Sequence, residues 1–314
     1  KVGRSIEGIS VFALDEKLKK TLEQQNIDQV IITTDKISQK RKNEVFNFFK
    51  LQGVKIFTVP AIDQWANSQG IVGNLKPIII EDLLRRDAIN IDLQKNVLQY
   101  QDKTILVTGA AGSIGSEIVR QLLKFKPHKL ILFDQAETPL FDLKNELLKT
   151  KHTTQFEFLL RSVSNYASVD QCFKAHTIDV VFHAAAYKHV YMTETTPAAA
   201  VLNNILGTKN VVDVAIKNKV AHFVMVSTDK AVNPSNVMGA SKRIAEMYVA
   251  NQAESSNTQL ITTRFGNVLG SNGSVVPIFK EQIAKGGPVT VTHPEITRFF
   301  MTITEACQLV LEAG

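Results

Sequence analysis

Short runs of β-branched and apolar residues alternate with longer amphipathic segments along most of the chain. Such alternation of strand-like and helix-like periods is typical of a parallel α/β sheet. The pattern is clearest after residue 102. It predicts strands at 104–108, 129–133, 156–160, 180–183, 223–227 and 259–264.

Amphipathic segments between these strands predict the helices that would cover the sheet. Their ranges are 113–125, 140–150, 168–176, 199–217 and 235–250, with another helical stretch at 304–312. A repeated βα unit of this kind predicts a doubly wound parallel sheet of the Rossmann class. We therefore interpret 103–314 as one domain.

The first hundred residues repeat the rhythm on a smaller scale. Strands are predicted at 9–12, 30–33 and 54–59, with helices at 16–25 and 40–51. No glycine fingerprint accompanies them, so 1–60 is predicted to be a partial small α/β unit without a cofactor. Residues 61–102 are interpreted as a connecting arm with a short helix at 80–86.

Composition narrows the class of protein. The 314 residues are 44% hydrophobic and 21% charged, as in a soluble globular protein. The net charge of +6 is spread along the chain, which suits a phosphate-bearing ligand or an anionic membrane surface but matches no nucleic-acid motif. Cys172 and Cys307 have neither metal nor redox spacing, and the histidines have no ligand spacing, so a reducing compartment and no metal are predicted.

A glycine-rich turn lies between the strand 104–108 and the following helix. Glycine allows close approach of a pyrophosphate, and the helix N-terminus offers free amides. An aspartate closes the next strand, where a carboxylate accepts hydrogen bonds from a ribose and disfavours a 2′-phosphate, which predicts NAD. The alternative, a structural turn with a surface aspartate, is less favoured. The predicted residues are Gly109, Gly112, Ser113, Ile114, Gly115 and Asp134.

The glycine spacing resembles that of the extended short-chain dehydrogenase/reductase superfamily. Two later motifs share the resemblance, an alanine run after His183 and an asparagine within the helix 199–217. The resemblance implies that the alanine run lies along NAD and that the asparagine braces the site. These residues are Ala184, Ala185, Ala186 and Asn204.

The superfamily normally places a tyrosine four residues before a catalytic lysine. Here Lys242 fills the lysine position, but Met238 replaces the tyrosine, and a thioether cannot take a proton. One interpretation is a silent protein that still binds NAD. The other moves the proton chemistry to Asp229 and Lys230, directly after the strand 223–227, where a carboxylate and an amine can supply an acid and a base.

Longer matches make the resemblance more specific. The runs 226–234 and 264–277, the methionine before Gly239, and the runs 112–117, 186–190 and 297–302 resemble the large, membrane-associated UDP-N-acetylglucosamine 4,6-dehydratases of the polysaccharide-biosynthesis group. The resemblance covers 103–314 and reaches into 81–84. It implies that 103–314 is an NAD-binding catalytic domain with an incomplete C-terminal substrate lobe. Met238 is itself typical of the large form.

The resemblance implies a cycle on a UDP-linked amino sugar. NAD removes hydride from carbon 4, water is eliminated from carbons 5 and 6, and the hydride returns to carbon 6. Asp229 would protonate the departing hydroxyl, Lys230 would take the carbon 5 proton, and Thr228 would bind the carbon 4 oxygen. Lys242 would hold the nicotinamide ribose. The base for the carbon 4 hydroxyl is left open between Asp229 and a water on Lys242.

Other residues are assigned by the same resemblance. Substrate contacts are expected from Lys188, His189, Glu194, Asn267, Ser274, Val275 and Arg298. An aspartate that contacts adenine in the family is replaced here by Ser162, next to Val163. Tyr187, Tyr248 and Phe279 are interpreted as packing residues.

Two alternatives and the cellular setting complete the expectations. A UDP-sugar 4-epimerase would need no acid–base pair after the strand and would normally keep the tyrosine. The second alternative is a catalytically silent NAD-binding module within a membrane glycosylation assembly. The resemblance also implies a longer protein, anchored at the cytoplasmic face of the bacterial inner membrane, that forms a homo-oligomer. No nucleic-acid partner is expected.

Overall fold

A computed structural model describes residues 5–6, 9–32, 38–58, 76–77, 97–271, 273–291, 293, 295 and 297–314. The chain divides into two compact units, 1–87 and 88–314. The expected helix at 80–86 and the matched run 81–84 lie outside the described residues. Among the described residues, no helix is both long enough and apolar enough to cross a membrane.

The first unit is a small α/β structure. Its elements are β1 (Ser5–Ile6), β2 (Ile9–Ser10), α1 (Glu16–Gln24), β3 (Gln29–Ile32), α2 (Gln39–Leu51), β4 (Lys55–Thr58) and β5 (Lys76–Pro77). Strands β3 and β4 are parallel, and β5 pairs antiparallel with β4 although it belongs to the expected arm. The core is formed by Leu22, Phe49, Val54 and Ile56.

The second unit contains a six-stranded sheet. Its strands are β6 (Thr104–Thr108), β7 (Lys129–Asp134), β8 (Gln155–Leu160), β9 (Val180–His183), β10 (His222–Thr228) and β11 (Gln259–Phe265). They are all parallel, in the order β11-β10-β9-β6-β7-β8. The predicted doubly wound Rossmann fold is confirmed. The strand order reverses between β6 and β9, where such folds bind ligands.

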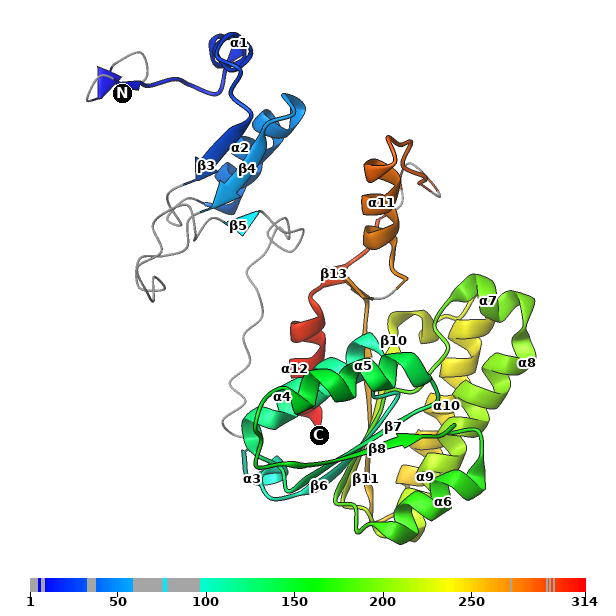
Figure 1. The fold of residues 1–314 in the computed structure, drawn as a ribbon. Coiled ribbons are helices and arrows are strands. Elements are labelled where there is room, and N and C mark those ends of the chain that lie inside the picture. Colours follow the sequence, from blue (N-terminus) through cyan, green and yellow to red (C-terminus); the bar gives the residue numbers. More distant parts are fainter. Residues whose placement is uncertain are drawn as a thin grey trace. The chain divides into compact units, whose positions relative to one another are not determined.

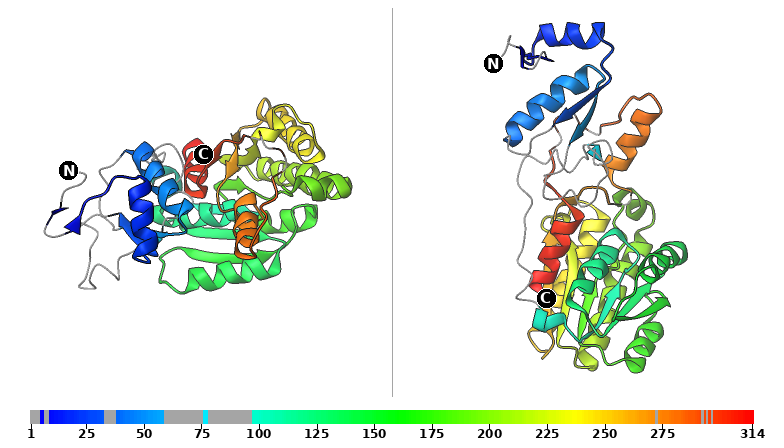
Figure 2. Two further views of the ribbon diagram at one scale, coloured as in Figure 1. Left: turned by 90° about the horizontal axis from the view of Figure 1, so that it is seen from above. Right: turned by 60° about the vertical axis from the view of Figure 1, so that its left-hand side comes forward.

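Helices cover both faces of this sheet because its strands are apolar on both sides. One face carries α4 (Ser113–Leu122, extended by a 3-10 turn at Leu123–Phe125), α5 (Glu137–Leu148) and α12 (Ile303–Ala313). The other carries α6 (Tyr166–Ala175), α9 (Gly207–Lys217) and α10 (Val237–Ala253). Figures 1 and 2 show α12, in red, beside α4. The short α3 (Val97–Tyr100) is tied to α12 by a hydrogen bond from Tyr100 Oη to the carbonyl of Leu311 (2.6 Å).

Three features differ from the pattern expected from the sequence. The helix expected at 199–217 consists of α8 (Pro197–Ala200), a π-helical segment (Val201–Leu206) and α9. The short helix α7 (Val190–Thr195) precedes it. A small lobe follows β11, built from β12 (Asn267–Val268), α11 (Val275–Ala284) and β13 (Phe300–Met301), with β12 and β13 paired in parallel.

Candidate functional site

The glycine turn joins β6 to α4 so tightly that Gly109 and Gly115 have no room for a Cβ. Gly109 adopts a φ of +66°, and a Cβ there would lie 2.6 Å from the backbone nitrogen of Ala185. A Cβ on Gly115 would lie 2.1 Å from the carbonyl oxygen of Gly109. The turn therefore leaves an open cradle at the N-terminus of α4, where backbone amides can meet an anion.

Asp134 stabilises this turn from the end of β7. Its Oδ2 accepts a hydrogen bond from the amide of Ala111, and its Oδ1 accepts one from the amide of Ala136, both at 2.9 Å. A carboxylate has about four acceptor positions, so capacity for a ribose hydroxyl remains. The same residue can thus order the turn and contact a nucleoside.

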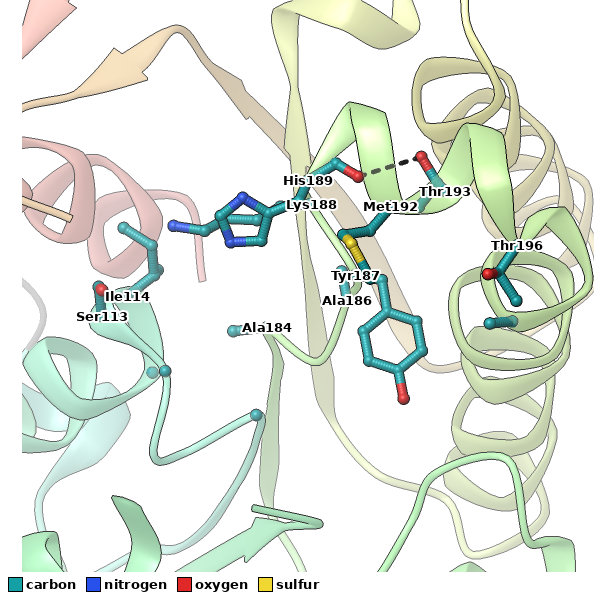
Figure 3. Close-up of a pocket in the computed structure, with 14 residues that line it drawn as sticks. Ser113, Ile114, Ala184, Ala186, Tyr187, Lys188, His189, Met192, Thr193 and Thr196 are labelled. Atoms are coloured by element: carbon teal, nitrogen blue, oxygen red, sulfur yellow. Dashed lines mark hydrogen bonds between the residues drawn. The ribbon is translucent and has the colours of Figure 1, made fainter. Parts of the chain in front are cut away.

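A first cavity of about 520 Å³ opens above the turn. Figure 3 shows the side chains of Lys188 and His189 extending toward Ile114 at the start of α4, whereas Tyr187 points in another direction. The Tyr187 hydroxyl accepts a hydrogen bond from Gln135 Nε2 (2.9 Å). Predicted residues lining this cavity are Gly109, Gly112, Ser113, Ile114, Gly115, Ala184, Ala186, Lys188 and His189.

A second cavity of about 680 Å³ adjoins the first and shares part of its wall, including Lys188 and His189. It brings together the carboxyl end of β10, the start of α10 and the lobe after β11. Predicted residues lining it are Ile114, Ala184, Ala186, Lys188, His189, Thr228, Lys230, Met238, Lys242, Asn267, Ser274, Val275 and Arg298.

Asp229 and Lys230 form an ion pair beside this second cavity. Lys230 Nζ donates to Asp229 Oδ1 (3.0 Å), which also accepts a hydrogen bond from the Thr228 hydroxyl (3.0 Å). Burial tends to raise the pKa of Asp229, but the hydrogen bonds from Lys230 and Thr228 outweigh it and lower that pKa. The resting pair is therefore a carboxylate and an ammonium.

Lys242 lies one helical turn after Met238 on the buried side of α10. Burial lowers the pKa of Lys242 to about 8, although the charge of Glu246 opposes the change. Glu246 itself is held by Arg264, whose Nε donates to its Oε1 (2.8 Å), and by the Ser227 hydroxyl (2.5 Å). An amine with this pKa can bind a proton or release one near neutral pH.

A buried network connects β6, β9 and the π-helical segment. The Thr208 hydroxyl donates to the carbonyl of Asn204 (2.7 Å), so it accepts from His183 Nε2 (2.9 Å), and His183 Nδ1 accepts from the Thr108 hydroxyl (2.7 Å). The backbone amide of Tyr187 donates to Asn204 Oδ1 (2.7 Å), and Asn204 Nδ2 donates to the backbone carbonyl of Tyr187 (3.0 Å). Asn204 thus braces the segment after β9.

The lobe after β11 supplies polar groups to the second cavity. Ser274 lies at the N-terminal cap of α11, and its buried hydroxyl has no hydrogen-bond partner among the described residues. Arg298 is exposed at the cavity wall. An uncapped helix N-terminus with a free hydroxyl and a guanidinium suits a phosphate group.

Some predicted residues line neither of these two cavities: Asp134, Ser162, Val163, Ala185, Asn204, Glu194 and Asp229. Glu194, expected in the sugar pocket, instead caps α10 by accepting from the amide of Val237 (2.7 Å). Ser162 donates to Gln135 Oε1 (3.0 Å) at the end of β8. Asp229 is linked to the second cavity through its ion pair with Lys230.

Sequence reasoning assigned two cavity residues to packing. Tyr187 lines both cavities and Phe279 lines the second. Tyr187 directly follows the alanine run, which was the available signal. Phe279 lies in α11, and no motif marks that helix in the sequence. Tyr248, the third residue assigned to packing, binds Asp213 and joins α10 to α9.

Comparisons with known proteins agree with this geometry. Residues 105–314 match the family described as polysaccharide biosynthesis protein. The chain is 47% identical over 98% of its length to the capsular polysaccharide biosynthesis protein CapD of Staphylococcus aureus, and it spans 52% of that protein's length. It is 40% identical to a UDP-glucose 4-epimerase of Rickettsia canadensis, covering 68% of this chain and 63% of that protein.

A solved structure gives a further comparison. The Bordetella bronchiseptica enzyme WbmH, in complex with NAD⁺, is 26% identical with a TM-score of 0.55, covering 67% of this chain and 71% of that one. The match supports the same fold for this chain, and the WbmH structure holds NAD⁺ in that fold.

Proposed function

Because this chain belongs to the polysaccharide biosynthesis protein family, we propose that it is an NAD-dependent 4,6-dehydratase of a UDP-linked amino sugar. The substrate is UDP-N-acetylglucosamine or a related UDP-sugar, and the product is a UDP-4-keto-6-deoxy amino sugar for capsule, O-antigen or other glycans. One observation carries the proposal: the Asp229–Lys230 pair flanks the cavity that contains Lys242, whereas Met238 replaces the usual tyrosine.

The cofactor is NAD. The turn at the N-terminus of α4, which has no room for a Cβ at Gly109 or Gly115, suits its pyrophosphate, and Asp134 suits its adenosine ribose. When bound, NAD would supply a hydride acceptor for carbon 4 of the sugar and later a hydride donor for carbon 6. Lys242 would hold the nicotinamide ribose. The N-terminus of α11, Ser274 and Arg298 bind the diphosphate of the sugar nucleotide.

The Asp229–Lys230 pair supplies the acid and the base. An ionised pair holds the same number of protons as a pair of a neutral amine and a carboxylic acid. One proton transfer across the 3.0 Å contact therefore converts the resting pair into the reactive one. Lys230 then takes the carbon 5 proton, and Asp229 protonates the leaving hydroxyl. As the hydride adds to carbon 6, Lys230 would return a proton to carbon 5, and the proton released from the carbon 4 hydroxyl would then restore the resting pair.

The proton of the carbon 4 hydroxyl needs a separate acceptor, since Met238 cannot serve. The two candidates are Asp229 and a water on Lys242. A lysine whose burial lowers its pKa to about 8 favours the second. Thr228 has one hydroxyl proton, which it would turn from Asp229 to the carbon 4 oxygen as the ketone forms.

Replacement of the base tests the proposal. With UDP-N-acetylglucosamine, mass spectrometry should show a product lacking one water. Lys230→Ala should slow its formation by about 100-fold or more, because the carbon 5 proton loses its acceptor. Lys151→Ala, which changes an exposed lysine, should leave the rate unaltered. Normal turnover by Lys230→Ala would contradict the assigned role.

A second candidate is UDP-sugar 4-epimerisation, which is favoured by the name of the Rickettsia relative. This activity would give an isomer of unchanged mass in the same assay. A third outcome, no reaction with intact NAD binding, would indicate a silent binding module. The dehydratase is preferred because an epimerase has no need of an acid–base pair at carbons 5 and 6.

The cellular setting is part of the proposal. The intact protein is a homo-oligomer anchored at the cytoplasmic face of the bacterial inner membrane. The net charge of +6 supports a position near an anionic surface. Membrane fractionation of the full-length protein in its native cells would test this placement.

A further inference from the structure

We propose that Asn267, already expected from the family resemblance to contact the sugar nucleotide, is also a positioning residue that holds the amine of Lys230 for proton abstraction. The inference rests on the proposed dehydratase function and adds a residue to its machinery. It would explain how binding of the substrate is joined to alignment of the base.

The first observation is a hydrogen bond to the base. Lys230 Nζ donates to Asn267 Oδ1 at 3.2 Å in addition to its 3.0 Å contact with Asp229. An ammonium group can only donate, so the amide oxygen must face it and the amide nitrogen must face elsewhere. The Lys230 amine is therefore held from two sides, by a carboxylate and by a carboxamide.

The backbone of Asn267 is fixed where this contact needs it. Its amide donates to the carbonyl of Phe299 (3.2 Å), and it pairs with Phe300 in the parallel β12–β13 ladder. A Cβ on the preceding Gly266 would lie 3.2 Å from the Phe299 oxygen and 3.6 Å from Asp229 Oδ2. Glycine at this position lets β12 lie close to the backbone of Phe299, next to Asp229.

The second observation is an unused donor. Asn267 Nδ2 is buried and has no hydrogen-bond partner among the described residues, although Asn267 lines the second cavity. A buried donor without an acceptor is unfavourable, so a ligand oxygen that meets it gains a binding contact. The hydroxyl of Ser274 is in the same condition on the wall of the same cavity. Two such donors fit an oxygen-rich ligand such as a sugar nucleotide.

A carboxamide suits this position because it is neutral. It accepts a hydrogen bond from the lysine in either protonation state and adds no negative charge that would retain the proton. A carboxylate of the same shape would favour the charged amine and hinder its action as a base. Asn267→Asp therefore separates positioning of the amine from simple packing.

The test is the pH dependence of water loss by the complete chain. In Asn267→Asp, the added charge disfavours the reactive pair of neutral amine and carboxylic acid, so we expect a roughly tenfold lower rate at pH 7. We also expect the basic limb of the rate profile, where Lys230 loses its proton, to move up by about one pH unit or more. Asn251→Asp adds the same charge at an exposed site on α10 and should keep the original profile. Superimposable profiles for Asn267→Asp and the unaltered chain would overturn the inference.

The titration of Lys230 can be measured directly and does not depend on the proposed function. In protein labelled with [¹⁵N]lysine, the Nζ resonance lost in Lys230→Ala identifies this residue, and its titration should move to higher pH in Asn267→Asp.

If the unaltered chain releases no water, the proposed function fails while this titration still decides the contact. If Asn267→Asp does not fold, Asn267→Ala should lower kcat and raise KM for the UDP-sugar, because both amide contacts are lost. An unchanged kcat and KM in Asn267→Ala would contradict the inference.

Discussion

His183 is held neutral in the core of the second unit. It is fully buried between the hydroxyls of Thr108 and Thr208, and the tautomer is set because Thr208 donates elsewhere. Burial lowers the pKa of His183 to about 3, and the nearby charge of Lys242 contributes to this effect. Protonation would break the acceptor contact at Nδ1, so the imidazole acts here as a structural link below the cavity floor.

Stability toward acid should depend on this residue. Between pH 6.5 and 3 the unfolded chain binds a proton at His183 that the folded chain does not, so the free energy of unfolding falls as the pH is lowered. At pH 5 the loss is about 2 kcal/mol. Urea unfolding at pH 7 and pH 5 should show a smaller loss in His183→Gln than in the unaltered chain. An equal loss in both would contradict the assignment.

At the scale of elements, the turn between β6 and α4 depends on two glycines to different degrees. A Cβ at Gly115 would lie 2.1 Å from the Gly109 oxygen, whereas one at Gly112 would lie 3.3 Å from it. Gly115→Ala should therefore weaken NAD binding by tenfold or more and lower Tm, because the turn must open. Gly112→Ala should have a smaller effect. Calorimetric titration with NAD would show the order, and equal affinities of the two variants would contradict it.

The elements that could be predicted are those with a strong local pattern. Strands β6 to β11 are apolar runs, and their predicted positions agree with the structure within a residue or two at each end. Strands β12 and β13 have two residues each and carry no periodicity. The π-helical segment is equally hidden, since Asn204 is held by Tyr187 and by Ser241 Oγ (2.9 Å), which are distant in sequence.

The site residues show the same difference between local patterns and contacts that are distant in sequence. Thr228, Lys230 and Lys242 could be placed from motifs at a strand end and on a helix. The hydrogen bond between Glu194 and the amide of Val237 could not be predicted, because it depends on how α7 packs against α10. The contact between Asn267 and Lys230 likewise joins a strand end to a separate lobe.

For the whole molecule, the sheet topology brings the two cavities together. The order reverses between β6 and β9, and the carboxyl ends of β6, β9 and β10 bring the glycine turn, the alanine run and Lys230, with Asp229 beside it, to adjoining cavities. In the proposed function, this arrangement would let a hydride taken from carbon 4 return to carbon 6 of the same sugar. The account requires this return within a single turnover.

Transfer of an isotope tests that requirement most directly. UDP-N-acetylglucosamine with deuterium at carbon 4 would be incubated with the protein and NAD in ordinary water, and the product examined by NMR and mass spectrometry. The account predicts a 4-keto product that lacks one water and carries the deuterium at carbon 6. An isomer of unchanged mass with deuterium still at carbon 4 would contradict it.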